Sequence, residues 1–179
     1  MELLLGGARS GKTRLAQGRA AESGLEPVYL ATATAGDAAM QQRIAHHRRD
    51  RATDSLAWTT IEEPLQLGPA IREHLQAGRC LVVDCLTLWL SNCLQRHCWP
   101  EQRTAFLDAL QSAGGQTDGP PGDRDCRLIL VSNETGLGVV PMGALTRDFV
   151  DASGRLHQQI ACLADAVSLV VAGLPLNLK

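Results

Sequence analysis

The sequence predicts a single α/β domain in which a mostly parallel sheet is covered by helices on both faces. Short apolar segments alternate along the chain with longer segments of helical character. Two of the apolar segments, Cys80–Asp84 and Arg127–Ser132, are nearly continuous, which is typical of parallel strands buried on both faces. The 179 residues, 45% of them hydrophobic, suffice for one core, so we expect one domain over residues 1–179.

The first predicted unit is a strand at Met1–Leu5, a glycine-containing loop, and a helix at Thr13–Ala21. The loop fits the phosphate-binding pattern G-x-x-x-x-G-K-[ST] over the residues Gly6-Gly7-Ala8-Arg9-Ser10-Gly11-Lys12-Thr13. In such a loop the backbone N–H groups surround phosphate oxygens at the positive end of a helix. We therefore expect Lys12 to reach the β- and γ-phosphates of a nucleotide and the Thr13 hydroxyl to bind Mg²⁺.

The following elements alternate between apolar runs and helical patterns. A strand at Pro27–Ala33 leads into a loop of small residues, and a helix follows at Asp37–Arg51. A second helix at Leu65–Gln76 precedes the buried strand Cys80–Asp84. We expect further helices at Leu86–Arg96 and Glu101–Ala113.

The last third of the chain repeats the alternation. Gly114–Asp123 has the glycine- and proline-rich composition of a mobile surface loop, and the strand Arg127–Ser132 follows it. Gly143–Leu163 is predicted to be largely helical, and Ala166–Ala172 forms the last strand. Ligands of such folds bind at the carboxyl ends of the strands, where the phosphate-binding loop also lies.

Asp84 ends a buried strand and therefore projects from the carboxyl edge of the sheet. This is where enzymes with a phosphate-binding loop place the carboxylate of the Mg²⁺ shell, although an Asp here could also cap the following helix. Polar residues after the strand Arg127–Ser132, such as Asn133 and Glu134, could face the same site. Turn formation explains Asn133 and Gly136 equally well.

Two adjacent histidines, His46 and His47, lie on the predicted helix Asp37–Arg51. His47 shares a stripe with Ile44 and is more often a structural histidine on pattern alone. However, Arg43 and Arg51 stand four residues to either side of it, so nearby cations would keep its imidazole neutral and nucleophilic. The same cations would bind phosphate oxygens.

Composition argues against several other classes of protein. The formal net charge of −2, the sequence pI near 6.2 and the 3% aromatic content do not fit a nucleic-acid-binding protein. No leader sequence or apolar run long enough to cross a membrane is evident, so we expect a cytoplasmic protein. The six cysteines show no zinc-ligand spacing and are expected to be reduced thiols. The three tryptophans are expected to be core or interface anchors.

Taken together, the motifs resemble the bifunctional adenosylcobinamide kinase / adenosylcobinamide-phosphate guanylyltransferase family of cobalamin biosynthesis. The resemblance covers nearly the whole chain, and beyond the phosphate-binding loop its residues are Tyr29-Leu30-Ala31-Thr32-Ala33, Arg43-Ile44-Ala45-His46-His47-Arg48, Trp58 with Glu62-Glu63-Pro64, Val83-Asp84-Cys85-Leu86-Thr87, Ser132-Asn133-Glu134, Gly138-Val139-Val140-Pro141 and Ala172-Gly173-Leu174-Pro175.

This resemblance implies a RecA-like P-loop NTPase fold, commonly trimeric, and two reactions. A nucleoside triphosphate, GTP or ATP, phosphorylates the aminopropanol hydroxyl of adenosylcobinamide. GTP then transfers GMP to that phosphate through a GMP-histidine intermediate, and His47 matches the guanylylated position. By the same match, the GTP site is lined by Ala31, Thr32, Ala33, Arg48, Arg49, Asp50, Arg51, Glu62 and Asp84.

The chain departs from the family pattern at two places. Gly114–Asp125 has no counterpart, and His157 stands where the pattern leads us to expect Asn. Two other functions also fit the phosphate-binding loop alone: a simple small-molecule kinase with a structural His47, and a GTP-dependent switch or RecA-like motor. The switch is disfavoured because no N-K-x-D motif for guanine recognition occurs in the sequence.

Overall fold

We analysed a computed structural model of the chain, which describes residues 1–36, 38–52, 56–114 and 126–179. Within the helix over residues 38–52, the side chains of residues 39, 43, 46, 47, 50 and 52 lie outside this description. The strands are β1 (Glu2–Gly6), β2 (Glu26–Ala31), β3 (Thr59–Glu62), β4 (Arg79–Asp84), β5 (Arg127–Asn133), β6 (Ala166–Val171) and β7 (Leu174–Asn177). The helices are α1 (Lys12–Ser23), α2 (Ala38–Ala52), α3 (Leu67–His74), α4 (Leu86–Gln95), α5 (Trp99–Gly114) and α6 (Ala144–Leu163).

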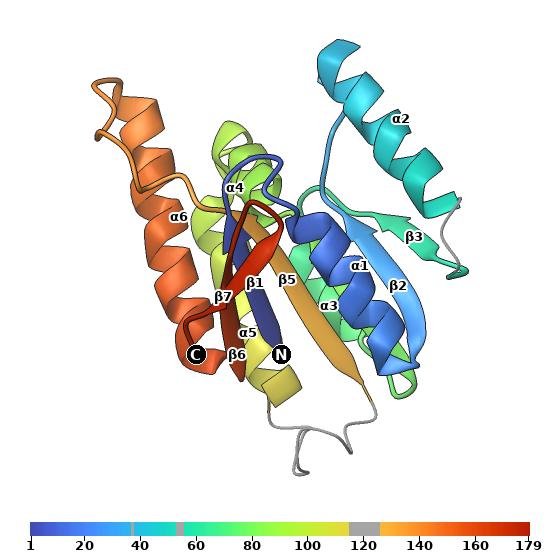
Figure 1. Cartoon of the computed structure of the whole chain (residues 1–179). Coiled ribbons are helices and arrows are strands. Elements are labelled where there is room, and N and C mark those ends of the chain that lie inside the picture. The colour runs from blue at the N-terminus through green and yellow to red at the C-terminus, as the bar shows by residue number, and fades with distance from the viewer. Residues whose placement is uncertain (37, 53–55, 115–125) are drawn as a thin grey trace.

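Within the described residues, the strands form one seven-stranded sheet in the order β3-β2-β4-β5-β1-β6-β7 (Figure 1). All neighbours pair in parallel except β7, which runs antiparallel to β6. The central strands are buried on both faces, as their continuous apolar runs predicted. The α/β class with a mostly parallel sheet is therefore confirmed.

Two apolar clusters cover the two faces of the sheet. One contains Leu4, Val82 and Ile129 and packs against Ala16 and Ala20 of α1. The larger one contains the alternate residues of the same strands and packs against α3, α4, α5 and α6, with Trp89 and Phe106 fully buried. Helices therefore lie on both faces, as expected. Helix α2 extends beyond the carboxyl edge of the sheet (Figure 1).

The two edge strands, β3 and β7, were missed by the sequence analysis. β3 (Thr59–Glu62) is short and mostly exposed, so it shows neither an apolar run nor an alternating pattern. β7 (Leu174–Asn177) contains Pro175, a residue that is compatible with a strand only at an edge or a bulge. Both strands depend on pairing with a neighbour that the local sequence does not reveal.

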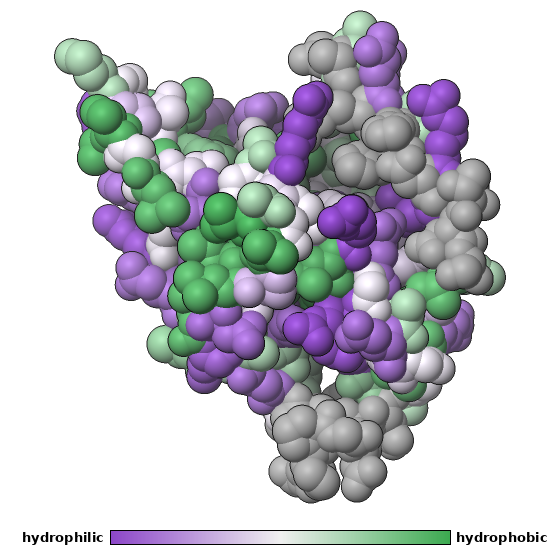
Figure 2. Space-filling view, viewed as in Figure 1, coloured by the Kyte–Doolittle hydropathy of each residue, from purple (hydrophilic) through white to green (hydrophobic). Residues whose placement is uncertain are grey.

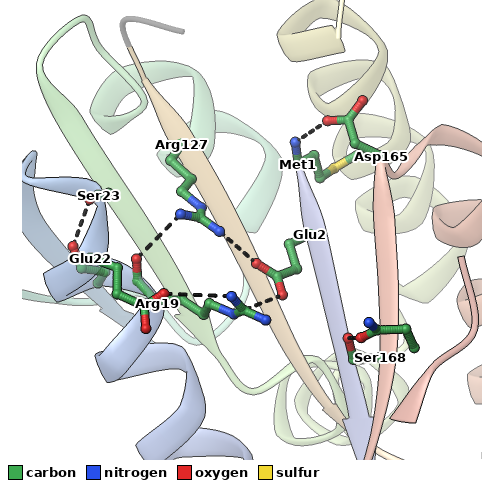
Figure 3. A network of polar contacts seen from close by, with 10 residues as sticks. Met1, Glu2, Arg19, Glu22, Ser23, Arg127, Asp165 and Ser168 are labelled. Carbon is green, nitrogen blue, oxygen red and sulfur yellow. Dashed lines mark hydrogen bonds and ion pairs between the residues drawn. The ribbon is translucent and has the colours of Figure 1, made fainter. Parts of the chain in front are cut away.

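At the amino-terminal edge of the sheet, a polar network joins β1 to its neighbours (Figure 3). The Glu2 side chain is buried, and its carboxylate lies 3.0 Å from Arg127 of β5 and 3.6 Å from Nε of Arg19 on α1. The amino group of Met1 pairs with the carboxylate of Asp165, just before β6. These contacts lie opposite the phosphate-binding loop, so we assign them to stability.

Most predicted boundaries agree with the observed elements to within two or three residues. The predicted loop Gly114–Asp123 lies outside the described residues except for Gly114, which is instead the last residue of α5. All six cysteines are free thiols, as expected. In the described part of the chain no helix is both long enough and apolar enough to span a membrane.

Candidate functional site

The carboxyl ends of the six parallel strands, β1 to β6, lie at one edge of the described sheet. In the register of the sheet, Gly6 is level with Asn133 of β5 and Val170 of β6, while Asp84 is level with Ala31 of β2 and Val131 of β5. Because parallel strands all end at the same edge, residues distant in sequence converge there. The phosphate-binding loop runs along this edge from β1 into α1.

Two glycines of the loop have backbone conformations that favour glycine. Gly6 has φ +154°, and a Cβ at this position would lie 2.4 Å from the carbonyl oxygen of Val170. Gly11 has φ +101°, and a Cβ there would contact Gly173. The Gly173 N–H also donates a hydrogen bond to the Ser10 carbonyl at 2.8 Å. The β6–β7 turn thus packs against the phosphate-binding loop.

Lys12 is buried at the start of α1, and its ammonium is held by the loop itself. Its Nζ donates to the carbonyl oxygens of Gly6 at 2.9 Å and Gly7 at 2.6 Å. Burial lowers the pKa of Lys12 below its ordinary value, although the nearby Asp84 partly offsets this effect. The loop therefore presents a compact positive charge where phosphate oxygens would lie.

Asp84 accepts two hydrogen bonds on one carboxylate oxygen. Thr13 Oγ1 donates to Oδ2 at 2.7 Å, and the hydroxyl of Tyr29 donates to the same atom at 2.9 Å. Burial, and secondly the charge of Asp84, raises the pKa of Tyr29 well above its usual value, so the phenol stays protonated and remains a donor. These contacts join α1, β2 and β4 around the predicted metal ligands.

Arg51, near the end of α2, covers the other side of Tyr29. Its guanidinium carbon lies 3.8 Å from the centre of the Tyr29 ring, a cation–π contact. The side chain is only 6% exposed, and its Nε has no hydrogen-bond partner among the described residues. A buried guanidinium with a free N–H is suited to binding an anionic ligand. Trp58 also packs against Tyr29, in a T-shaped arrangement with 5.9 Å between the ring centres.

A cavity of about 500 Å³ lies between the phosphate-binding loop, α2 and the ends of β2 and β4. From the predicted site residues it brings together Ala8, Arg9, Ser10, Gly11, Lys12, Thr13, Ala31, Ala33, Arg48, Arg51, Glu62 and Asp84. This volume is in the range of small-molecule sites. Arg48 and Glu62 form an exposed ion pair at its rim.

Other predicted site residues are not among the cavity lining that the structure describes. Gly6 and Gly7 bind Lys12 through their carbonyl groups, and Arg49 is exposed on α2. Thr32 is fully buried, and its hydroxyl both donates to the Cys85 carbonyl and accepts from the Cys85 N–H. The side chains of His46, His47 and Asp50 lie outside the described residues.

Sequence reasoning did not single out several residues that line the cavity: Tyr29, Met40, Cys85 and Leu88. Asn133, which was one of the polar residues expected to face the site, does line it. Tyr29 was identifiable in principle, because it lies two residues before Ala31 and therefore on the same face of β2. Burial, and secondly Asp84, raises the pKa of Cys85 to about 11, so this thiol is not a nucleophile at neutral pH.

A second polar cluster adjoins the loop on the side away from α2. The Glu134 N–H donates to the Gly6 carbonyl at 2.9 Å, the same oxygen that Lys12 contacts. The Glu134 carboxylate faces His157 of α6, with 3.6 Å between Oε2 and Nδ1. Burial lowers the pKa of His157, while Glu134 acts in the opposite direction. His157 is thus a buried residue beside the site.

The donor set fits Mg²⁺ in the way expected of a phosphate-binding loop. In the ranges that the structure describes, no three His, Cys, Asp or Glu side chains converge as a self-sufficient metal site. The Thr13 hydroxyl and the Asp84 carboxylate instead lie in hydrogen-bond contact. Mg²⁺ is commonly held by one or two such oxygen ligands together with water and substrate phosphates.

The comparisons with known proteins cover the whole chain. The sequence model of the cobinamide kinase / cobinamide phosphate guanyltransferase family matches residues 2–178. The bifunctional adenosylcobalamin biosynthesis protein CobP of Pseudomonas aeruginosa is 52% identical over 178 residues, which are 99% of this chain and 96% of that protein. Bifunctional adenosylcobalamin biosynthesis proteins called CobU are 33% identical in Escherichia coli and 31% identical in Salmonella typhimurium, each covering 100% of this chain and 99% of the relative.

A solved structure from Pyrococcus horikoshii superimposes with a TM-score of 0.50 at 9% identity, covering 100% of this chain and 85% of that one. At this level of identity, the similarity supports the fold alone.

Proposed function

This chain belongs to the cobinamide kinase / cobinamide phosphate guanyltransferase family, and we propose that it carries out both reactions on adenosylcobinamide. A nucleoside triphosphate phosphorylates the aminopropanol hydroxyl, and GTP then donates GMP to that phosphate, which gives adenosyl-GDP-cobinamide and pyrophosphate. The observation that carries this proposal is the meeting of Lys12, Thr13 and Asp84 at a cavity also lined by two arginines of α2.

In the kinase step, the phosphate-binding loop holds the triphosphate. The Lys12 ammonium exchanges its bonds to the loop carbonyls for phosphate oxygens, and backbone N–H groups near Gly11 bind the remaining oxygens. The substrate oxygen forms a bond to the γ-phosphorus as the bond to the bridging oxygen breaks. The nucleoside diphosphate leaves with the electron pair.

Thr13 and Asp84 would hold Mg²⁺, which supplies positive charge to the triphosphate when it is bound. Their mutual hydrogen bond of 2.7 Å and the Tyr29 bond to the same oxygen keep these ligands in place beforehand. The expected consequence is that Asp84→Asn loses Mg²⁺-dependent activity while keeping the fold, because the amide preserves the size of the side chain.

In the guanylyltransferase step, we propose His47 as the nucleophile. A ring nitrogen attacks the α-phosphorus of GTP, a phosphorus–nitrogen bond forms, and pyrophosphate leaves. The phosphate oxygen of the corrinoid then attacks the same phosphorus and releases the imidazole. Supporting this role, Arg48 and Arg51 of the same helix line the cavity and can neutralise charge that develops on the phosphate oxygens. Arg49, Asp50, Ala31, Thr32, Ala33 and Glu62 complete the proposed GTP site.

The experiment that tests this function uses Mg²⁺ and GTP labelled at the α-phosphorus, without corrinoid. We expect a labelled protein whose bond is acid-labile and alkali-stable, as a phosphoramidate is. The label should be absent from His47→Ala and present in His46→Ala, which is the matched control. GTP binding without any covalent label would leave a simple kinase or a GTP-dependent switch as the better account.

We also propose that the enzyme is a homotrimer in the cytoplasm. Apolar side chains are exposed on the β6–β7 hairpin, at Val171, Leu174 and Leu176, and on the segment from Leu137 to Leu145 (Figure 2). Such surfaces on a small domain are typical of subunit contacts. Light scattering should give three times the 19.2 kDa of one chain, and Leu174→Glu should lower that mass. Six free thiols accord with a reducing compartment.

A further inference from the structure

The side chains of Glu134, which is partly buried, and His157, which is buried, form an acid–base pair that the proposed reactions have not yet used. Glu134 directly follows β5, and its N–H shares the Gly6 carbonyl oxygen with Lys12, at 2.9 Å for each bond. Its backbone is therefore one hydrogen bond from the loop that binds phosphate. The cavity that would hold the nucleotide lies toward α2, and Glu134 is not among the residues that line it, so this side chain adjoins the loop outside the cavity.

The Glu134 carboxylate is held by a hydrogen bond at one oxygen and is partly exposed. Oε1 accepts a hydrogen bond from the Gly136 N–H at 2.6 Å, and Oε2 faces Nδ1 of His157 at 3.6 Å. The Glu134 side chain is 21% exposed, whereas that of His157 is 8% exposed. A substrate could therefore contact the Glu134 carboxylate more readily than the buried His157 ring.

The other ring nitrogen of His157 is provided with partners for either protonation state. Nε2 lies 2.7 Å from Ser132 Oγ and 3.5 Å from Ser153 Oγ. A hydroxyl can donate or accept, so the imidazole can gain a proton at Nδ1 without leaving a buried polar atom unpaired. Of the groups facing the ring from β5 and from α6 itself, Glu134 is the one that carries charge, since Ser132 and Ser153 are neutral.

We propose that Glu134 is the general base of the kinase step and that His157 is its positioning residue, which orients the carboxylate and shares the proton. The inference rests on the proposed kinase function. As the substrate oxygen bonds to the γ-phosphorus and the nucleoside diphosphate leaves, the hydroxyl proton moves to Glu134 Oε2. It then passes to Nδ1 of the neutral imidazole whose proton is on Nε2, giving an imidazolium–carboxylate pair that later loses the proton to water.

The pair has a defined pH dependence. When the imidazole is already protonated, it cannot take a further proton from Glu134. The kinase kcat should therefore fall as the pH drops through the pKa of His157, which burial places below its ordinary value. Without the imidazole, only a carboxyl group titrates, so the acid limb should move to lower pH.

The first test measures His157 itself in the whole protein, by following its ring resonances by NMR as the pH is changed. Glu134→Gln should lower the imidazole pKa further, because it removes the carboxylate that stabilises the charged ring. An unchanged His157 titration in Glu134→Gln would overturn the pairing. This readout does not require any enzymatic activity.

The second test compares the pH profiles of the corrinoid-dependent kinase reaction. Glu134→Gln should lower kcat about 100-fold or more and leave formation of labelled GMP-enzyme from GTP unchanged. His157→Asn should lower the plateau kcat by about tenfold, with little change in KM, and shift the acid limb. His97→Asn is the matched control: His97 is exposed at φ +55°, a conformation that Asn tolerates.

The outcomes separate this inference from the function on which it rests. If the wild type phosphorylates no corrinoid, the proposed function is wrong. If the wild type is active and His157→Asn has the same kcat and pH profile as His97→Asn, then His157 is only structural and the inference fails. A loss of GMP-enzyme in Glu134→Gln would also overturn it, because that effect would be a general disturbance of the site.

Discussion

Gly6→Ala is expected to damage both stability and nucleotide binding, for a reason that the local sequence does not contain. The added Cβ would lie 2.4 Å from the Val170 carbonyl oxygen, whereas ordinary contacts begin at 3.4 Å. The end of β1 would therefore have to move by about 1 Å. Such overpacking lowers the free energy of unfolding by about 1–3 kcal/mol. The positive φ lowers it further by a similar amount.

A reduced entropy of the unfolded chain offsets these costs by only about 0.4–1 kcal/mol. We thus expect Gly6→Ala to lose about 3 kcal/mol of unfolding free energy, measured by urea denaturation. Because the Gly6 carbonyl binds Lys12, a shift of the loop should also weaken GTP binding by at least about tenfold, measured by calorimetry.

The neighbouring Gly7 provides the control for this prediction. A Cβ on Gly7 would meet nothing within 4 Å, and its φ is not positive. Gly7→Ala should therefore keep the wild-type stability to within about 0.5 kcal/mol. Equal stability of Gly6→Ala and Gly7→Ala would show that β1 and β6 do not approach each other as closely as the structure places them.

Three further perturbations test other contacts. Tyr29→Phe removes one donor to Asp84 and should lower the free energy of unfolding by about 1–2 kcal/mol; a loss below 0.3 kcal/mol would mean that water replaces the bond. Glu2→Ala leaves Arg127 without its buried partner and should lower the free energy of unfolding by about 2 kcal/mol. This loss should be smaller at high salt, because salt weakens the interaction between the two charges. Since folding lowers the pKa of His157, the unfolded chain takes up its proton first as the pH falls below about 6.5. The wild type should therefore lose stability relative to His157→Asn over that range. Parallel curves of unfolding free energy against pH for the two proteins, from pH 7.5 to 5, would contradict this prediction.

The α/β class and the phosphate-binding loop could be predicted from the amino-acid sequence alone. This was possible because both depend on local features: the continuous apolar runs of buried parallel strands, and the fixed spacing of Gly6, Gly11 and Lys12. The position of Asp84 at a strand end was equally local, and the structure brings it within 2.7 Å of Thr13. The family resemblance, seen in the order of the motifs, agrees with the comparisons.

The side chains that surround those motifs could not be predicted in this way, because they come together only in the folded chain. Tyr29 joins Arg51 to Asp84 because β2 and β4 are neighbours and the end of α2 brings Arg51 onto the Tyr29 ring, and neither relation is encoded within a short segment. The edge strands β3 and β7 depend on pairing with a neighbouring strand, and their own sequences show no strand pattern. Likewise, His157 meets Glu134 only because α6 packs beside the end of β5. Motifs carry their own spacing along the chain, whereas burial, pairing and pKa shifts depend on neighbours that folding brings together.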